Sequence, residues 1–96
     1  MKMLMIICPP ERQEAVRDLL ARHGLGAYSE IAGLKGEGKT GKKLGTRLFP
    51  EESVLIFTVI PESRQEELVA ALKDFASKLY QAEGMKVFAL PVETLV

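Results

Sequence analysis

The stretch MLMIICPPERQE, residues 3–14, decides the fold, because the chain repeats its plan in LIFTVIPESRQE, residues 55–66. In each stretch an apolar run of strand length ends at a proline, Pro9 or Pro61, and a segment with helical spacing of apolar residues follows. The tripeptide Arg-Gln-Glu occupies the same place in both copies. The sequence therefore indicates a duplicated strand–helix unit.

The remaining elements follow from these two anchors. We expect helices over residues 10–23 and 62–80, each with one apolar stripe, and strands over residues 2–8, 25–32, 54–60 and 85–90. Residues 91–96 are expected to add a short edge strand. The order βαββαβ is that of a ferredoxin-like sandwich, so we predict a single α+β domain over residues 1–96. Its antiparallel four-stranded sheet should carry two helices on one face.

The two predicted central strands, residues 2–8 and 54–60, are apolar at almost every position. Helices cover only one face of such a sheet, so a strand that is apolar on both sides implies a second cover. We therefore expect a homo-oligomer whose sheets share an interior. The alternative is a monomer in which tails and long side chains cover the open face.

Composition restricts the possible partners. Thirteen basic residues balance 13 acidic ones, so net charge does not favour nucleic acid as a partner. The single cysteine, Cys8, forms no internal disulfide, and the apolar run of residues 3–8 is too short for a signal core or a membrane span. These features predict a cytoplasmic protein.

The segment GLKGEGKT, residues 33–40, fits the phosphate-loop pattern G-x-x-x-x-G-K-[ST]. A working phosphate loop needs a helix that begins at its Lys-Thr, but residues 41–50 have glycines, no apolar period and a final proline. We therefore do not predict a nucleotide hydrolase. The loop over residues 33–50 holds five of the chain's eight glycines and five basic residues against one acid. It is either an anion-binding segment or a solvated hairpin tip.

The segments IAGLKG, residues 31–36, and EGMKVF, residues 83–88, complete a pattern over essentially the whole chain. With the βαββαβ order, the chain resembles the small trimeric signalling proteins of the nitrogen-regulatory P-II type, and more loosely the CutA-like proteins of the same superfamily. The resemblance implies that residues 33–50 form a shortened T-loop that contacts partner proteins. This loop has no tyrosine, so uridylylation is not expected.

The resemblance also implies a ligand site between subunits. The loop base and a glycine-lysine turn of the neighbouring subunit would hold an adenine nucleotide (ATP, ADP or AMP) or another anion. By this likeness the site residues are Gly33, Lys35, Gly36, Gly38, Lys39, Gly84 and Lys86.

The expected function is that of a non-enzymatic regulator: a homotrimer without a resident cofactor that controls a protein target, such as a membrane-associated transporter or an enzyme. The alternative is a CutA-like metal-binding or metal-tolerance protein on the same scaffold, with carboxylates, His23 or Cys8 as ligands. The residues by themselves favour other roles, since His23 stands where a helix ends and Cys8 ends an apolar strand. One histidine in 96 residues supports no catalytic constellation.

Overall fold

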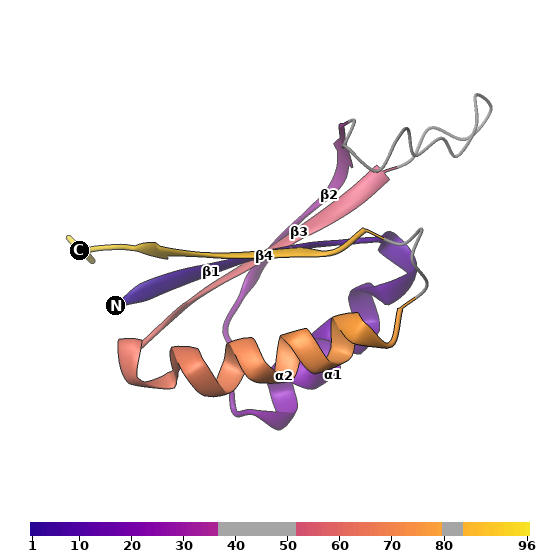
Figure 1. Ribbon diagram of the computed structural model, residues 1–96. Coiled ribbons are helices and arrows are strands. Elements are labelled where there is room, and N and C mark those ends of the chain that lie inside the picture. Colours follow the sequence, from indigo (N-terminus) through magenta and orange to yellow (C-terminus); the bar gives the residue numbers. More distant parts are fainter. Residues whose placement is uncertain (37–51, 80–83) are drawn as a thin grey trace.

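The computed structural model describes residues 1–36, 52–79 and 84–96. Its strands are β1 (Lys2–Cys8), β2 (Ser29–Lys35), β3 (Glu52–Ile60) and β4 (Lys86–Pro91), and its helices are α1 (Gln13–Arg22) and α2 (Gln65–Ser77). The strands form one antiparallel sheet in the order β2-β3-β1-β4 (Figure 1). The predicted ferredoxin-like βαββαβ fold is confirmed.

The duplication seen in the sequence is also a duplication of backbone geometry. Both helices begin with a three-residue 3₁₀ turn, Pro10–Arg12 before α1 and Glu62–Arg64 before α2. The Arg12 amide donates to the Pro9 carbonyl at 2.9 Å, and the Arg64 amide donates to the Pro61 carbonyl at 3.0 Å. A proline presets the φ of an extended residue and has no amide to leave unsatisfied, so the same chemistry produces the same strand-to-helix turn twice.

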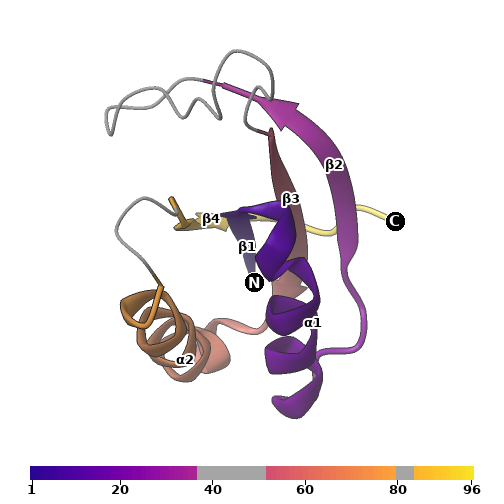
Figure 2. The same ribbon diagram turned by 90° about the vertical axis from the view of Figure 1, so that its right-hand side faces the viewer.

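The core lies between one face of the sheet and the two helices, which Figure 2 shows on the same side of the sheet. Alternate residues of β1 and β3 point toward the helices and are fully shielded, as the strand period of two requires. The buried apolar residues are Leu4, Ile6, Cys8, Val16, Leu19, Leu20, Val54, Ile56, Ile60, Leu68 and Leu72.

One polar side chain, Thr58, lies in this core with 4% exposure. Its hydroxyl donates to the Ala27 carbonyl at 2.7 Å, which satisfies the buried group and fastens the connection before β2 to β3.

The main differences from the prediction concern the second strand and the residues after Pro91. The second strand begins at Ser29, because residues 23–26 are used to end α1: Gly24 has φ +77° and the Leu25 amide donates to the Leu20 carbonyl. The strand then continues through Gly33 to Lys35, so the first predicted loop residues belong to β2. Residues 92–96 add no strand, because Pro91 already pairs with Lys2 at the start of β1.

Candidate functional site

The predicted loop base is a β-bulge near the end of β2. Ile31 pairs with Leu55 and Leu34 with Ser53, so Ala32 and Gly33 together face the single residue between those partners on β3. Gly33 has φ +77°, a conformation that L side chains rarely adopt. By contrast, Gly36 has an ordinary φ, and a Cβ there would meet no atom within 4 Å. The backbone of the single chain therefore favours a glycine at position 33 but not at position 36.

The bulge decides where Lys35 points. Directly paired residues of antiparallel strands share a face, and the extra residue puts Ile31 and Leu34 on the same side of the sheet. Lys35 pairs with Glu52 and projects on the side that carries the helices. Its side chain is exposed, in the part of the β2–β3 ribbon that extends away from the rest of the sheet (Figure 1).

The second half of the predicted site starts β4. Lys86 pairs with Ile7 and so projects on the face that the helices leave open, while Gly84 precedes it and is half-buried. β2 and β4 are opposite edges of the sheet, three strand spacings apart, or about 14 Å. Lys35 and Lys86 of one chain therefore lie toward the same end of the sheet but on opposite edges and opposite faces. Gly38 and Lys39 lie outside the described residues.

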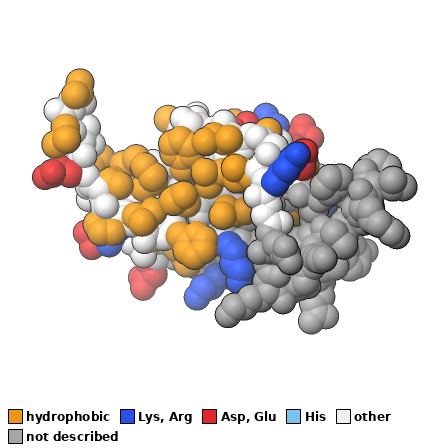
Figure 3. Space-filling view, turned by 90° about the horizontal axis from the view of Figure 1, so that it is seen from above, with side chains coloured by type: hydrophobic (Ala, Val, Ile, Leu, Met, Phe, Trp, Pro, Cys, Tyr) orange, Lys and Arg blue, Asp and Glu red, His pale blue; other side chains and the backbone are white. Residues whose placement is uncertain are grey.

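The open face of the sheet is apolar across all four strands. Figure 3, seen from this side, shows hydrophobic side chains over most of the described surface. Ile31 is 49% exposed and Phe88 is 51% exposed, one near each edge. A patch of this kind is typical of a surface that another protein covers. The strand register assigns these apolar residues to the face: Met3, Met5, Ile7, Ile31, Leu34, Leu55, Phe57, Val59, Phe88 and Leu90.

Met5 lies at the middle of this open face, paired with Phe57 on one side and Phe88 on the other. Direct cross-strand neighbours have Cβ atoms about 5 Å apart, so a thioether stands between two aromatic side chains. These three side chains form an apolar centre on the open face, on the side of the sheet away from the helices.

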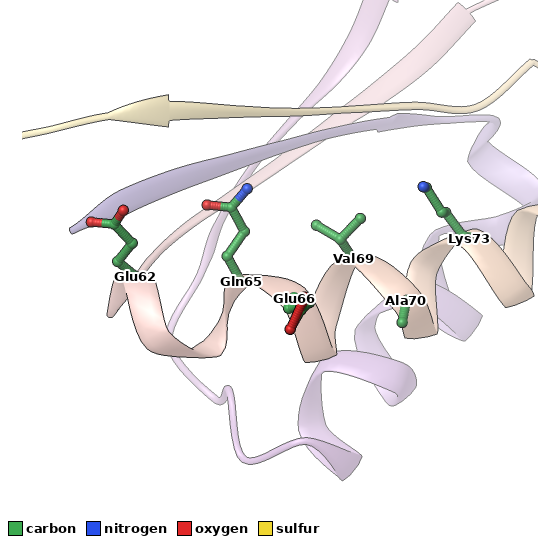
Figure 4. Close-up of a pocket in the computed structure, with 6 residues that line it drawn as sticks. All are labelled: Glu62, Gln65, Glu66, Val69, Ala70 and Lys73. Atoms are coloured by element: carbon green, nitrogen blue, oxygen red, sulfur yellow. The ribbon is translucent and has the colours of Figure 1, made fainter.

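A groove of about 500 Å³ runs along α2, away from the predicted site residues. Figure 4 shows Gln65, Val69 and Lys73 extending from α2 toward the strands. Its lining combines acidic, basic and small apolar side chains: Glu62, Gln65, Glu66, Val69, Ala70 and Lys73.

His23 belongs to a polar cluster that joins the two helices, which the sequence did not reveal. Its Nδ1 lies 3.2 Å from Glu67 Oε2, and Arg64 Nη2 donates to the His23 carbonyl at 2.6 Å and to Glu67 Oε2 at 3.1 Å. Hydrogen bonds from Arg64 and then His23 lower the pKa of the Glu67 carboxyl below its ordinary 4.5. His23 also caps α1, with its amide bonded to the Leu20 carbonyl.

A second polar cluster, also not foreseen, links α1 to β2. Gln13 Nε2 donates to Glu30 Oε1 at 3.0 Å, and Arg17 Nε lies 3.2 Å from Glu30 Oε2. Arg17 Nε and Glu30 Oε2 are shielded from water and make no aligned hydrogen bond. The attraction between their charges compensates the cost of burying them. The sequence signal was a glutamate at a strand position that faces the helices.

The metal alternative finds no ligand set in the described parts of the chain. Over residues 1–36, 52–79 and 84–96, no group of three or more His, Cys, Asp or Glu side chains could hold a metal ion. Cys8 is fully buried, and burial followed by the negative charge of Glu30 raises the pKa of its thiol to about 11. A thiol this hard to ionise is a poor metal ligand.

We compared the chain with known protein families, protein sequences and solved structures. The family model of nitrogen regulatory protein P-II matches residues 1–96. A comparison with curated protein sequences found no significant match. Among the described residues, no helix is both long and apolar enough to cross a membrane.

Solved structures of similar fold include the nitrogen regulatory PII-like protein CPII from Thiomonas intermedia K12. Its complex with ADP and bicarbonate superimposes with a TM-score of 0.70 at 25% identity, over 95% of this chain and 86% of that chain. The complex with ADP, AMP and bicarbonate has a TM-score of 0.70 at 24% identity over 95% and 86% of the two chains. The apo form has a TM-score of 0.67 at 22% identity over 95% and 89%.

Proposed function

This chain belongs to the nitrogen regulatory protein P-II family, and from that membership we propose that it acts as a non-enzymatic regulator in the cytoplasm. In this proposal it forms a homotrimer that binds an adenine nucleotide, a small anion or both in the clefts between subunits. Effector binding then controls a partner protein through residues 33–50. A membrane-associated transporter or an enzyme is the kind of partner we expect.

The observation that carries the proposal is the separation of the two lysines. Lys35 and Lys86 lie on opposite edges and opposite faces of the sheet, so they do not converge on a single anion within one chain. In a cyclic assembly the β2 edge of one subunit can approach the β4 edge of the next. A cleft formed in this way brings one lysine from each subunit to the same ligand.

The apolar open face supports the same assembly. Ten apolar side chains from four strands lie on it, and the two described helices are on the other side. Burying this face against two other copies removes apolar surface from water at a gain of about 25 cal/mol per Å². The driving force for the trimer thus comes from the residues that make β1 and β3 apolar on both sides.

Related structures indicate the effector class. CPII has been solved with ADP and bicarbonate, and its nucleotide and carbonate-type anion are both negatively charged. We extend this chemistry to the present chain because Lys35 and Lys86 provide cationic groups and Gly36 leaves backbone open to close approach.

Calorimetric titration with ADP, AMP and ATP, each with and without bicarbonate, tests the proposal. We expect at least one nucleotide to bind, and we expect Lys35→Ala and Lys86→Ala each to weaken binding about tenfold, since each removes a charge-assisted contact. Lys73→Ala is the matched control, because Lys73 lines the groove on α2 and lies outside the proposed site. Binding that is lost in Lys73→Ala and kept in the other two variants would place the ligand in the groove.

Mixed assemblies test the sharing of the site between subunits. When Lys35→Ala and Lys86→Ala chains are unfolded together and refolded as mixed trimers, about one cleft in four pairs an intact Lys35 with an intact Lys86 of the neighbour. High-affinity ADP binding should therefore return at about a quarter of the sites. A mixture that binds no better than either variant alone contradicts a site built from two subunits.

A further inference from the structure

The alternation of apolar residues specifies the register of β2 only weakly. Five of its seven residues are exposed, and Ile31, its one large apolar residue before the bulge, lies on the open face. Among the described strands, β2 is an edge strand whose neighbour is β3. Because side chains alternate with a period of two, a one-residue slip would move every side chain of such a strand to the other face.

Glu30 is the residue of β2 that resists such a slip. It pairs with the buried Ile56, so its carboxylate projects into the helix layer at a position where most strands carry an apolar side chain. There α1 supplies both partners: Gln13 donates to one carboxylate oxygen at 3.0 Å and Arg17 lies 3.2 Å from the other.

A slip would break both interactions at once. Glu30 would move to the open face, beside apolar residues such as Leu55 and Phe57 that have no group to pair with a carboxylate. Arg17 Nε would lose its counter-charge. Removing the partners of the partly buried Glu30 carboxylate costs free energy, so the cluster favours the native register.

The register set at Glu30 is transmitted along the strand to Lys35. Between them lie the bulge and the left-handed Gly33, which together put Lys35 opposite Glu52 on the helix side. A slip by one residue carries Lys35 to the other face.

We propose that the Gln13–Glu30–Arg17 cluster sets the register of β2, and that Glu30 is thereby a positioning residue for Lys35 in the effector site. The role of the cluster in setting the register is inferred from its contacts alone. The effect of the register on effector binding by Lys35 rests on the proposed function.

The experiment measures register and binding separately in the full-length protein. Nuclear Overhauser contacts between Leu34 and Ser53 and between Lys35 and Glu52 report the register, and calorimetry reports ADP affinity. In Glu30→Ala we expect both cross-strand contacts to be lost or split between two registers, and ADP affinity to fall about tenfold, as for loss of Lys35 itself.

Glu30→Leu separates register from charge. Leucine has no charge to offer a ligand, but its apolar side chain prefers the helix side of the sheet and keeps the native register. We therefore expect this variant to restore both the cross-strand contacts and ADP affinity. Glu14→Ala is the matched control, because it removes an exposed acid from α1, while the bonds of Gln13 and Arg17 in the cluster are made to Glu30.

The outcomes are distinct. Native cross-strand contacts in Glu30→Ala overturn the register assignment. A changed register with unchanged ADP affinity, while Lys35→Ala does weaken binding, overturns the positioning role. Weak ADP binding in Glu30→Leu despite native cross-strand contacts also overturns the positioning role, since the charge of Glu30 and not the register would then determine ADP affinity. If the unmodified protein binds neither nucleotide nor bicarbonate, the proposed function fails, while the Overhauser contacts still decide the register.

Discussion

At the level of single residues, the bulge in β2 depends on one backbone conformation. Gly33 has φ +77°, and the space around it would admit a Cβ, so only the dihedral angle makes glycine necessary. Gly33→Ala should lower the free energy of unfolding by about 1 kcal/mol, the usual cost of a left-handed non-glycine residue. Urea unfolding followed by circular dichroism measures the difference.

Gly36→Ala is the control for this prediction, because position 36 has an ordinary φ and open space around it. It should leave the free energy of unfolding within about 0.5 kcal/mol of the unmodified protein. Equal losses in the two variants would show that the strained angle at Gly33 is not what requires glycine.

Glu67 makes the stability of the fold depend on pH. Its pKa is lowered in the folded state by hydrogen bonds from Arg64 and His23, so folding favours the ionised carboxylate. This contribution is present above the ordinary pKa of 4.5 and is lost as the pH falls through the lower folded value. The unfolding free energies of the unmodified protein and Glu67→Gln should therefore converge as the pH falls below 4.5.

Denaturant titrations at a series of acidic pH values check this convergence. Glu66→Gln serves as the control, since the neighbouring exposed side chain makes none of the contacts with Arg64 or His23. A difference between the unmodified protein and Glu67→Gln that stays constant through the acid range would contradict the role assigned to Glu67.

At the level of elements, the apolar stripe of α2 holds that helix on the sheet. Leu72 is 1% exposed and lies in the core with Leu68, its neighbour one turn earlier. Leu72→Ala should lower the free energy of unfolding by about 2–5 kcal/mol, because it removes buried methyl groups and leaves a cavity.

Val69→Ala is the matched control on the same helix, because Val69 is only half-buried beside the core. Its smaller side chain and remaining exposure predict a loss of about 1 kcal/mol. Both measurements need one fixed protein concentration, since an assembly couples stability to association. Equal losses in the two variants would falsify the assignment of Leu72 to the central core.

At the level of the whole molecule, the apolar open face should hold the copies together. Phe88 stands at the β4 edge of this face, paired with Met5 and 51% exposed in the single chain. Phe88→Asp puts a charge where the subunits would meet, and an unpaired charge is costly to bury. Light scattering should find a trimer of the 10.6 kDa chain for the unmodified protein and a monomer for the variant.

Ala70→Asp is the control for this measurement. It adds the same charge to an exposed position of α2, on the helix side of the molecule. This variant should keep the mass of the unmodified protein. A trimeric Phe88→Asp, or a monomeric unmodified protein, would remove the open face from the interface.

Much of the architecture was predictable because local rules agree with each other. The runs that end at Pro9 and Pro61 predicted two strand-to-helix turns, and the structure has both with nearly the same geometry. The extent of β2 was not predictable, because SEIAGLK alternates poorly and contains a glycine. Its course depends on a bulge and on a glutamate held by another element, and neither has a periodic signal in the sequence.

In the candidate site, too, some features could be predicted from the sequence and others depend on the fold. Lys35 and Lys86 were selected by the resemblance to P-II proteins, but their placement on opposite edges and faces follows from strand order and register. The contacts of His23 with Glu67 and of Gln13 with Glu30 join residues far apart in the chain. One sequence does not identify the two partners of such a pair, although a glutamate on the helix side of a strand indicates that a partner for it exists.

By itself, the sequence determined the two strand–proline–helix units, the apolar character of both faces of the central strands and the basic, glycine-rich segment between the halves. These properties come from local spacing and side-chain polarity, which need no knowledge of the fold. Only the tertiary structure decided which face stays open, where Lys35 points and which edges carry the two lysines. The reason is that strand order, register and a single bulged residue are set by long-range pairing, and one residue more or less reverses the side on which every later side chain lies.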